Sequence, residues 1–408
     1  MQIGFDITSL YVAQAGVFYY RYNQIKAMLA LNSPAHQFLL LDYFPVHGGW
    51  RTPPEIETLT SPHAELRHVR GIRQRKLSRL HLVHKLGIRP FAKMIDETLF
   101  APWARWEAQD KERQLQKNLA SLDIFHTSDV LQYAAPHIKT VTTIYDMTTL
   151  LFPEMHTVET REMQQKKYRF AQEKADAVIA ISQSARQDVI NLLGIEPERV
   201  HVVYAGVDPS FRPLSDEEIA PHLAKFNLQV DSYILTVGTI EPRKNLVRLI
   251  QAYHAVWQKQ PKSMPKLVLA GATGWFFREV FALVKNLGLS KQVLFIGRVD
   301  DADLPALYNG ALFLAYPTLY EGFGMPALEA MACKTAVLTS NTSSLPEVVG
   351  NAGLLIEPTD VDSIMYGLQQ LIEDNPYRRK LSQMGLQRAT KFAWENAAKE
   401  TLQLYMSI

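Results

Sequence analysis

The chain has 408 residues, of which 47% are hydrophobic and 21% charged, and its formal net charge is +2. This length and composition predict an ordinary globular protein with two domains. Such a small net charge gives no support for a nucleic-acid partner. The single cysteine, Cys333, excludes a disulfide framework and a cysteine-based metal site.

The first residues, Met1–Asp6, start a strand and lack the basic segment that precedes the apolar run of a signal peptide. No apolar run in the sequence reaches the roughly 20 residues of a membrane span. We therefore expect a cytoplasmic protein that is at most peripheral on the inner face of the plasma membrane.

Short apolar strands alternate with helix-favouring segments through the first half of the sequence. Strands are predicted over residues 3–7, 38–41, 124–126, 140–144, 176–181 and 200–204, helices over residues 16–30 and 103–119, and a long loop over residues 45–62. Ser182 is placed to cap the helix that follows residue 181. This alternation is typical of a parallel sheet covered by helices on both faces.

Between Glu65 and Asp96 the sequence has no acidic residue, and basic residues are interleaved with leucines. The basic residues are Arg67, Arg70, Arg73, Arg75, Lys76, Arg79, Lys85, Arg89 and Lys93. Such a segment can bind an anionic membrane surface or a phosphate-bearing acceptor, or it can be a solvated basic face between packed elements. The sequence leaves these interpretations open.

A stretch with Gly206, Pro209 and Pro213 interrupts the pattern and predicts a linker. Further strands are predicted over residues 233–237, 266–270, 292–296, 312–315, 336–338 and 354–356, and the last helices over residues 361–373, 378–391 and 394–406. We therefore expect an α/β protein with two doubly wound domains, residues 1–206 and 207–390, and a final helix in residues 391–408. Ligands of such sheets bind at the carboxyl ends of the strands.

Two carboxylates, Glu321 and Glu329, bracket a glycine-rich turn that opens into a helix near Pro326. The turn residues are Gly322, Phe323, Gly324 and Met325. The backbone N–H groups of such a turn and the positive end of the helix dipole attract an anion, while carboxylates accept hydrogen bonds from hydroxyl groups. The pattern predicts a ligand with an anionic part and several hydroxyls, such as a nucleotide sugar.

Arg243 and Lys244 follow the predicted strand over residues 233–237, at the start of a helix. Gly238, next to Thr239, permits a sharp turn or the close approach of a ligand. Arginine can bind two phosphate oxygens at once and lysine adds a compact charge, so the pair suits a departing nucleoside diphosphate. Because these cations can supply the positive charge, we expect no metal ion.

Other phosphate and metal motifs have little support. The sequence has no Gly-x-Gly-x-x-Gly after a strand and no P-loop. Asp301 and Asp303 precede a helix, and Glu241 precedes another, so we interpret them as charges at helix N-termini.

The Glu-x7-Glu pattern of Glu321 and Glu329 and the run Glu-Pro-Arg-Lys-Asn at residues 241–245 resemble the retaining glycosyltransferases of family 4 (group 1), in particular bacterial polysaccharide mannosyltransferases. The resemblance covers nearly the whole chain. It implies the GT-B fold, in which two Rossmann-like domains face each other across a cleft. It also implies that the last helix crosses back to the first, acceptor-binding domain.

The resemblance implies a role for each motif. Arg243 and Lys244 would bind the donor diphosphate, Glu321 the transferred sugar and Glu329 the nucleotide ribose. The other donor-binding positions that it implies are Gly16, Gly238, Thr239, Gly297, Arg298, Val299, Gly322, Phe323, Gly324 and Met325.

Tyr145 and Asp146 stand where relatives usually have His-Asp, whose histidine contacts the transferred sugar. We include both with Glu321, Arg243 and Lys244 as candidate catalytic residues. A tyrosine, with an unperturbed pKa near ~10, is a poor proton carrier at neutral pH, so this departure affects the sugar preference or the rate. Asp146 either accepts a hydrogen bond from a sugar hydroxyl or closes an Asx turn after its strand.

His126 and Phe18 are the candidate acceptor contacts. His126 ends a predicted strand, and Phe18 follows Gly16 at a position where family members commonly have small residues. Each has a structural alternative, namely a hydrogen-bonded histidine and a core aromatic residue.

The implied function is transfer of a hexose, most specifically mannose from GDP-mannose, with retention and without a metal ion. The acceptor would be an oligosaccharide or a polyprenyl-diphosphate-linked saccharide in cell-surface polysaccharide synthesis, and the nucleotide sugar would be a co-substrate, with no cofactor. Three alternatives remain: a UDP-sugar donor, a nucleotide-sugar isomerase, and a non-catalytic binding subunit, which only the Tyr145 departure supports.

Overall fold

The computed structural model of the protein describes residues 1–11, 16–31, 34–44, 54–59, 61–70, 101–261 and 264–408. Of the predicted basic segment, Arg67 and Arg70 are described, and the positions from Arg73 to Lys93 lie outside the described residues. A membrane or phosphate contact there stays a prediction. Among the described residues, no helix combines the length and the apolar character needed to cross a bilayer.

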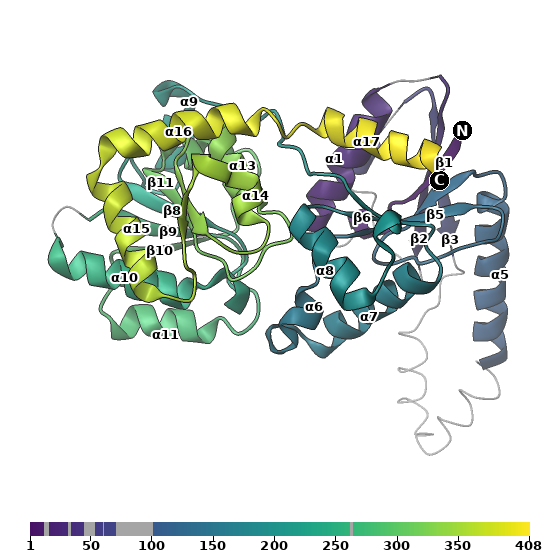
Figure 1. The fold of residues 1–408 in the computed structure, drawn as a ribbon, viewed down its shortest axis with the longest axis horizontal. Coiled ribbons are helices and arrows are strands. Elements are labelled where there is room, and N and C mark those ends of the chain that lie inside the picture. The colour runs from purple at the N-terminus through teal and green to yellow at the C-terminus, as the bar shows by residue number, and fades with distance from the viewer. Residues whose placement is uncertain (12–15, 32–33, 45–53, 60, 71–100, 262–263) are drawn as a thin grey trace, which may run out of the picture. The chain divides into compact units, whose positions relative to one another are not determined.

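The chain packs as two compact units (Figure 1). Unit 1 comprises Met1–Thr143, Gln165–Val178 and Thr401–Ile408, and unit 2 comprises Ile144–Gln164 and Ile179–Glu400. The domain boundaries predicted after residues 206 and 390 stay a prediction.

Seven strands form the first sheet, in the order β3-β2-β1-β4-β5-β6-β7, and the pairings from β3 to β5 are parallel. The strands are β1 (Gln2–Asp6), β2 (Gln37–Phe44), β3 (Ala64–Arg70), β4 (Ile124–His126), β5 (Lys139–Ile144), β6 (Ala177–Ala180) and β7 (Val200–Val202). The helices of this part of the chain are α1 (Gly16–Ala30), α2 (Pro54–Glu57), α5 (Ala101–Leu119), α6 (Thr148–Leu151), α7 (Val158–Glu173) and α8 (Gln183–Leu193). Ser182 caps α8, as predicted, because its side chain accepts a hydrogen bond from the Ala185 N–H.

Strand β3 and the short helix α2 are absent from the sequence prediction. β3 is an outermost strand of the sheet, where charged residues are tolerated. Glu65 and Arg67 form an exposed ion pair of 2.6 Å, whereas Val69 is buried. The charged residues of β3 therefore concealed its strand character.

Six parallel strands form the second sheet, in the order β10-β9-β8-β11-β12-β13. The strands are β8 (Tyr233–Val237), β9 (Lys266–Ala270), β10 (Val293–Gly297), β11 (Phe313–Tyr316), β12 (Val337–Ser340) and β13 (Leu354–Ile356). The helices are α9 (Asp216–Ala224), α10 (Leu246–Lys259), α11 (Arg278–Asn286), α12 (Leu304–Gly310), α13 (Met325–Ala332), α14 (Leu345–Val349), α15 (Val361–Glu373), α16 (Asn375–Ala389) and α17 (Trp394–Ser407). The strand predictions for this half are confirmed to within two residues, and with both sheets the predicted α/β fold class is confirmed.

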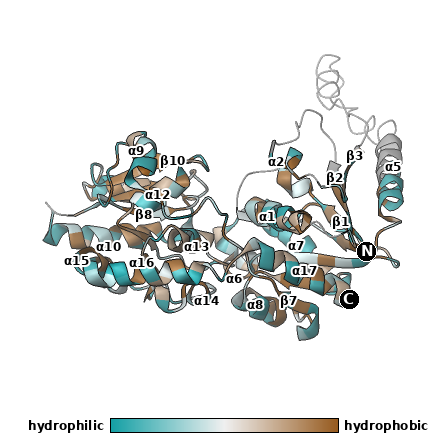
Figure 2. Cartoon of the chain, turned by 90° about the horizontal axis from the view of Figure 1, so that it is seen from above, coloured by the Kyte–Doolittle hydropathy of each residue, from teal (hydrophilic) through white to brown (hydrophobic). Residues whose placement is uncertain are grey.

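Helix α10 illustrates how the sequence builds the helical layers. Leu249, Ile250, Tyr253 and Val256 recur at helical spacing and are at most 3% exposed. Fully burying side chains of this size contributes roughly 1.5–3 kcal/mol each. Figure 2 shows the complementary pattern on α16, where many residues are hydrophilic.

The last helix, α17, ends in unit 1, because Thr401–Ile408 cluster with the N-terminal residues. The Tyr405 hydroxyl lies 2.5 Å from His126 Nδ1, and Gln24 Nε2 donates a hydrogen bond of 3.1 Å to Thr401 Oγ1. The predicted return of the last helix is therefore confirmed.

Candidate active site

The candidate site lies at the carboxyl ends of β8 and β11 in unit 2. After β10 the chain returns to the other side of β8 and forms β11, so these two neighbours mark the topological switch point of the sheet. Open parallel sheets bind ligands at such a point, because the loops leaving the two strands diverge there. The loops in question carry Gly238–Lys244 and Pro317–Gly324.

Arg243 and Lys244 lie in a short 3₁₀ helix, Pro242–Lys244, between β8 and α10. Gly238 has a φ of +141°, and a Cβ atom there would lie 3.0 Å from Lys244 Cε. The predicted glycine thus leaves space for the lysine side chain. Thr239 packs against the next loop, because a Cβ on Gly274 would lie 2.6 Å from its Cγ2.

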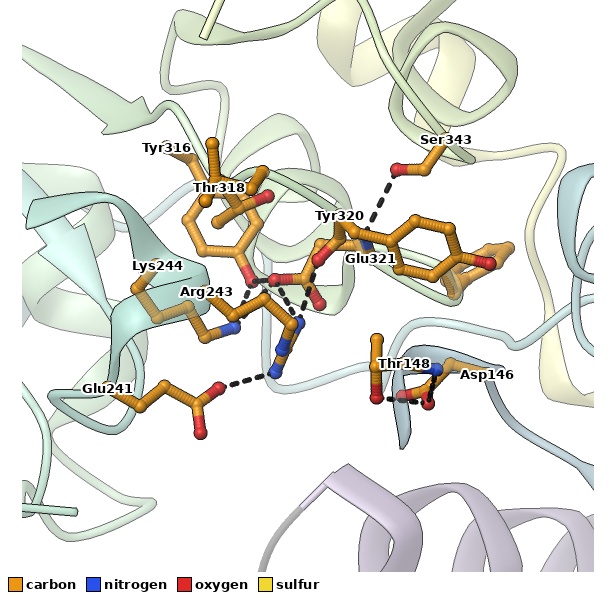
Figure 3. Close-up of polar contacts among 12 residues, drawn as sticks. Asp146, Thr148, Glu241, Arg243, Lys244, Tyr316, Thr318, Tyr320, Glu321 and Ser343 are labelled. Atoms are coloured by element: carbon orange, nitrogen blue, oxygen red, sulfur yellow. Dashed lines mark hydrogen bonds and ion pairs between the residues drawn. The ribbon is translucent and has the colours of Figure 1, made fainter. Parts of the chain in front are cut away.

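One carboxylate oxygen of Glu321 contacts both cations, Arg243 and Lys244 (Figure 3). Glu321 Oε1 lies 2.8 Å from Arg243 Nη1 and 2.7 Å from Lys244 Nζ, and it accepts a hydrogen bond of 2.8 Å from the Tyr316 hydroxyl. Arg243 Nη2 also donates to Glu241 at 2.6 Å, and Nη1 donates to the Tyr320 carbonyl at 2.9 Å. The structure therefore joins the two predicted motifs in one buried cluster.

Burial and pairing act in opposite directions on these charges. Burial opposes the charge of Arg243, but the carboxylates of Glu321 and Glu241 outweigh it and raise the pKa of the guanidinium. Burial alone would raise the pKa of Glu321, but Arg243 and Lys244 lower it to about 2. Burial lowers the pKa of Lys244, and Glu321 offsets this only in part. At neutral pH the site therefore holds an ionised Glu321 against a permanent cation.

The glycine turn after Glu321 is fixed by the loop after β12. The Glu321 N–H donates to Ser343 Oγ at 3.0 Å, and the Ser344 hydroxyl lies 2.8 Å from the Phe323 carbonyl oxygen. Gly324 has a φ of +103° at the N-cap of α13, and a Cβ there would lie 2.7 Å from Leu345 Cδ2. These contacts position the turn, with Met325 as the first residue of α13. Phe323 is 3% exposed, and its ring packs against Tyr204 and Phe392, so its predicted donor contact stays a prediction.

Tyr145 and Asp146 lie against the same turn. A Cβ on Gly322 would lie 1.9 Å from the Tyr145 carbonyl oxygen and 3.1 Å from Asp146 Cβ. Asp146 Oδ1 accepts hydrogen bonds from the Thr148 N–H at 3.0 Å and hydroxyl at 2.6 Å, so the predicted Asx turn is present. The Asp146 charge also acts on Arg243. Its contact with a sugar stays a prediction.

Glu329 lies on α13, where Oε2 accepts a hydrogen bond of 2.8 Å from the Tyr308 hydroxyl. Burial raises the pKa of Glu329 to about 7, and the charges of Asp301 and Asp208 contribute. This carboxyl therefore titrates near neutral pH, unlike Glu321.

Gly297, Arg298 and Val299 leave the end of β10. Gly297 has a φ of +72°, and its carbonyl accepts a hydrogen bond of 2.8 Å from the Gly271 N–H. Arg298 is exposed and Val299 is half-buried. Their predicted donor contact is untested.

The candidates in unit 1 have different surroundings. His126 is 0% exposed, with Nδ1 against the Tyr405 hydroxyl and Nε2 2.8 Å from Thr143 Oγ1. Phe18 is 3% exposed and packs on Tyr19 and Tyr22. Both side chains are core residues here, and we do not propose them as acceptor contacts. Gly16 begins α1, and a Cβ there would meet no heavy atom within 4 Å.

The two charges interpreted as lying at helix N-termini do lie there, with Glu241 at the N-cap of the 3₁₀ helix Pro242–Lys244 and Asp303 at the N-cap of α12. Glu241 makes no capping hydrogen bond and instead pairs with Arg243. The Asp303 side chain likewise makes no capping hydrogen bond, and it pairs with Lys225 at 2.6 Å and with His222. Within the described residues, no group of three or more His, Cys, Asp or Glu side chains is arranged to hold a metal ion.

Sequence reasoning missed Tyr316, Glu241 and Ser343 as parts of the site. Each lies at or just beyond the carboxyl end of a strand, β11, β8 or β12. That shared position was the signal that could have found them, because such loops meet at one edge of the sheet.

Comparisons with known proteins show which family the chain resembles. A family model described as glycosyl transferases group 1 matches residues 222–388, and one described as glycosyltransferase family 4 matches residues 58–211. The chain is 35% identical over 267 residues to O-antigen chain mannosyltransferase B of Escherichia coli. This match covers 65% of the chain and 70% of the relative. It is 36% identical over 264 residues to serotype-specific mannosyltransferase WbdA of Escherichia coli, covering 64% of this chain and 32% of that relative, so it spans about a third of WbdA.

Among solved structures, the chain is similar to Anabaena HepE in complex with UDP-glucose. The TM-score is 0.71 at 18% identity, and the match covers 100% of both chains. At this identity the likeness shows the fold alone.

Proposed function

The chain is a member of the glycosyl transferases of group 1, family 4, and from this membership we propose that it transfers mannose from GDP-mannose to a saccharide acceptor with retention at the anomeric carbon. The observation that carries the proposal is the cluster of Arg243, Lys244 and Glu321 at the switch point of unit 2. A glycosyltransferase must stabilise a departing nucleoside diphosphate, and this pair of cations is suited to that task.

The cations keep donor capacity for a phosphate. Arginine has five N–H donors, of which Arg243 uses one on the Tyr320 carbonyl and one on Glu241, and its Nη1 also forms the ion pair with Glu321. No partner within the described residues uses the Nε–H or the second Nη2–H of Arg243. Lys244 Nζ directs two of its three donors to Tyr316 and Glu321. The remaining donors can bind a diphosphate without breaking the cluster.

In the proposed reaction the bond between the anomeric carbon and the β-phosphate oxygen breaks. An acceptor hydroxyl forms the new bond to the same face of that carbon, and its proton passes to the leaving phosphate. Arg243 and Lys244 balance the charge that grows on the phosphate, so the proposal includes no metal ion. Glu321 orients the cations through Oε1, and its Oε2 accepts a hydrogen bond from a hydroxyl of the transferred sugar.

The remaining donor contacts are proposed from the same motifs. Glu329 would bind the ribose hydroxyls, and the backbone groups of the turns at Gly238, Gly297 and Gly324 would face the diphosphate and the base. Phosphate binding by backbone N–H groups at a helix N-terminus supports the role of the turn before α13.

Support for mannose comes from the relatives, since both are named as mannosyltransferases. The name of the first relative refers to an O-antigen chain, which supports a polysaccharide acceptor. Because HepE of the same fold was solved with UDP-glucose, a UDP-sugar donor is the second candidate.

The test is a donor screen with the purified full chain. GDP-mannose, GDP-fucose, UDP-glucose, UDP-galactose and UDP-N-acetylglucosamine would be incubated with and without a mannose-terminated oligosaccharide, and nucleotide release measured. We expect GDP release from GDP-mannose that increases with acceptor, and an α-linked product by NMR. Preferential turnover of a UDP-sugar would overturn the donor, a β-linked product the retention, and conversion of the sugar without acceptor would favour an isomerase.

A further inference from the structure

His156 follows the predicted Tyr145–Asp146 pair in a segment of unit 2 that contacts the rest of that unit at three points. Gly322 lies against the Tyr145 carbonyl, as described above. Phe152 packs edge-on against Tyr320 with ring centroids 6.1 Å apart. Trp275 Nε1 donates a hydrogen bond of 2.5 Å to the Met155 carbonyl. The backbone next to His156 is therefore fixed beside the loops of the candidate site.

The imidazole of His156 has no partner for either nitrogen. Nδ1 and Nε2 are both buried, and neither makes a hydrogen bond to any part of the chain that the structure describes. The ring instead lies tilted against Trp275, with centroids 6.3 Å apart. Leaving a buried polar group unsatisfied typically costs about 1–3 kcal/mol, so such a group calls for an explanation. His126, in contrast, has partners for both nitrogens.

The charges of the candidate site act on this imidazole. Burial lowers the pKa of His156, and Asp146 and Arg243 act on it with opposite signs. The imidazole is therefore neutral at neutral pH and offers one N–H donor and one acceptor nitrogen. A sugar hydroxyl also donates and accepts one hydrogen bond, so the two groups are complementary.

We propose that His156, supported by Trp275, is a further substrate-binding residue that hydrogen-bonds a pyranose hydroxyl next to the loops of the candidate site. This inference rests on the proposed function. The pyranose is either the transferred hexose or the acceptor sugar. Trp275 is a positioning residue, because its indole N–H holds the Met155 carbonyl and its ring holds the plane of the imidazole.

The test separates these two sources of the sugar. For His156→Ala, one arm measures the KM of the donor from nucleotide release without acceptor, and the other measures the KM of the acceptor at saturating donor. We expect one of the two constants to rise about 3- to 10-fold, which is the range for the loss of one hydrogen bond. His156→Gln, which keeps a donor and an acceptor, should recover part of the loss, and Trp275→Phe should raise the same constant by a smaller factor.

The matched control is His254→Ala on α10, because His254 also lies against a tryptophan, Trp257, with ring centroids 5.9 Å apart. This variant should leave both constants unchanged. A rise in the donor KM assigns the transferred hexose, and a rise in the acceptor KM assigns the acceptor sugar. Unchanged constants in a folded His156→Ala protein would overturn the inference.

Failure of the proposed function would be visible separately, as a wild-type protein that turns over no donor. In that case, calorimetric titration with GDP-mannose and then with the acceptor oligosaccharide would compare the affinities of wild type and His156→Ala for each ligand. Equal affinities of the two proteins for both would count against the contact.

Discussion

Glu321 shows how one side chain organises the candidate site. It pairs with Arg243 and Lys244, two residues that are distant in the sequence but lie beside it at the switch point. Breaking a buried pair by removing one partner leaves a charge without compensation, so variants at this cluster need a stability control. The two cations nevertheless contribute differently, because arginine keeps its charge at every accessible pH and a buried lysine does not.

Arg243→Ala should lower kcat about 10²- to 10³-fold, because a donor aimed at the developing phosphate charge is lost. The measurement is steady-state transfer, with the thermal midpoint as a check of folding. Arg212→Ala is the matched control, since Arg212 forms an exposed ion pair of 2.8 Å with Glu218 and should retain activity. Undiminished transfer by Arg243→Ala would remove the guanidinium from the proposed mechanism.

Glu329 should make stability depend on pH. Its pKa is raised from 4.5 to about 7 in the folded protein, mainly by burial. The folded state therefore holds a proton that the unfolded state has released. This contribution to stability is complete below pH 4.5 and is lost as the pH rises through about 7.

Glu329→Gln keeps an oxygen for the Tyr308 hydroxyl and does not titrate. The unfolding free energy of this variant minus that of wild type should increase by about 2–3 kcal/mol between pH 5 and pH 8. Urea denaturation at several pH values measures this difference, in which the contributions of the histidines cancel. A difference that does not vary with pH would show that Glu329 is not perturbed in this way.

At the scale of elements, the turn between β11 and α13 depends on glycines for close packing rather than for flexibility. Gly322 is the clearest case, because a Cβ there would meet the backbone oxygen of Tyr145 at 1.9 Å. Backbone cannot rotate out of the way as a side chain can. The turn and the loop that carries Asp146 are therefore held at a separation that only glycine permits.

Gly322→Ala should destabilise the protein by about 1–3 kcal/mol, the usual range for overpacking, and should lower transfer by shifting the turn. Gly288→Ala is the control, since a Cβ at Gly288 meets no heavy atom within 4 Å and only its φ of +69° is unfavourable. Chemical denaturation and steady-state activity measure the two effects. Equal behaviour of the two variants would contradict the close packing at Gly322.

Tyr405→Phe should weaken the attachment of α17 within unit 1. The hydroxyl lies 2.5 Å from buried His126 Nδ1, and its loss leaves that nitrogen unsatisfied at a cost of about 1–3 kcal/mol. Tyr366→Phe, at a side chain that is 65% exposed, provides the control. Urea denaturation should separate the two variants. A Tyr405→Phe protein as stable as wild type would show that this hydrogen bond contributes little.

At the scale of the whole molecule, a ligand that binds only the folded protein must raise its stability. Because GDP-mannose is the proposed donor, GDP should raise the thermal midpoint more than UDP at equal concentration. A ligand present at 100 times its Kd stabilises the folded state by about 2.7 kcal/mol. Addition of EDTA should leave both the shift and the transfer rate unchanged if no metal ion takes part. A larger shift with UDP would favour the UDP-sugar alternative, and inactivation by EDTA would require a metal ion in the mechanism.

The sequence by itself determined the strands of both sheets other than β3 and the two motifs of the candidate site, while the return of the last helix was implied by the resemblance to family 4. It could do so because strands of a covered parallel sheet are short apolar runs, and because the glycines and cations directly follow them. The sequence prediction missed strand β3 because an outermost strand need not be apolar.

Only the tertiary structure decided which charges pair and which side chains are covered. Glu321 with Arg243, Asp303 with Lys225, and His126 with Tyr405 are each contacts between separate segments. Local sequence reports the propensity of a residue for a helix, a strand or a turn. The partner of a buried polar group, in contrast, depends on which segments the fold brings together. The roles inferred for Tyr316, His156 and Trp275 could therefore be recognised only from their contacts in the structure.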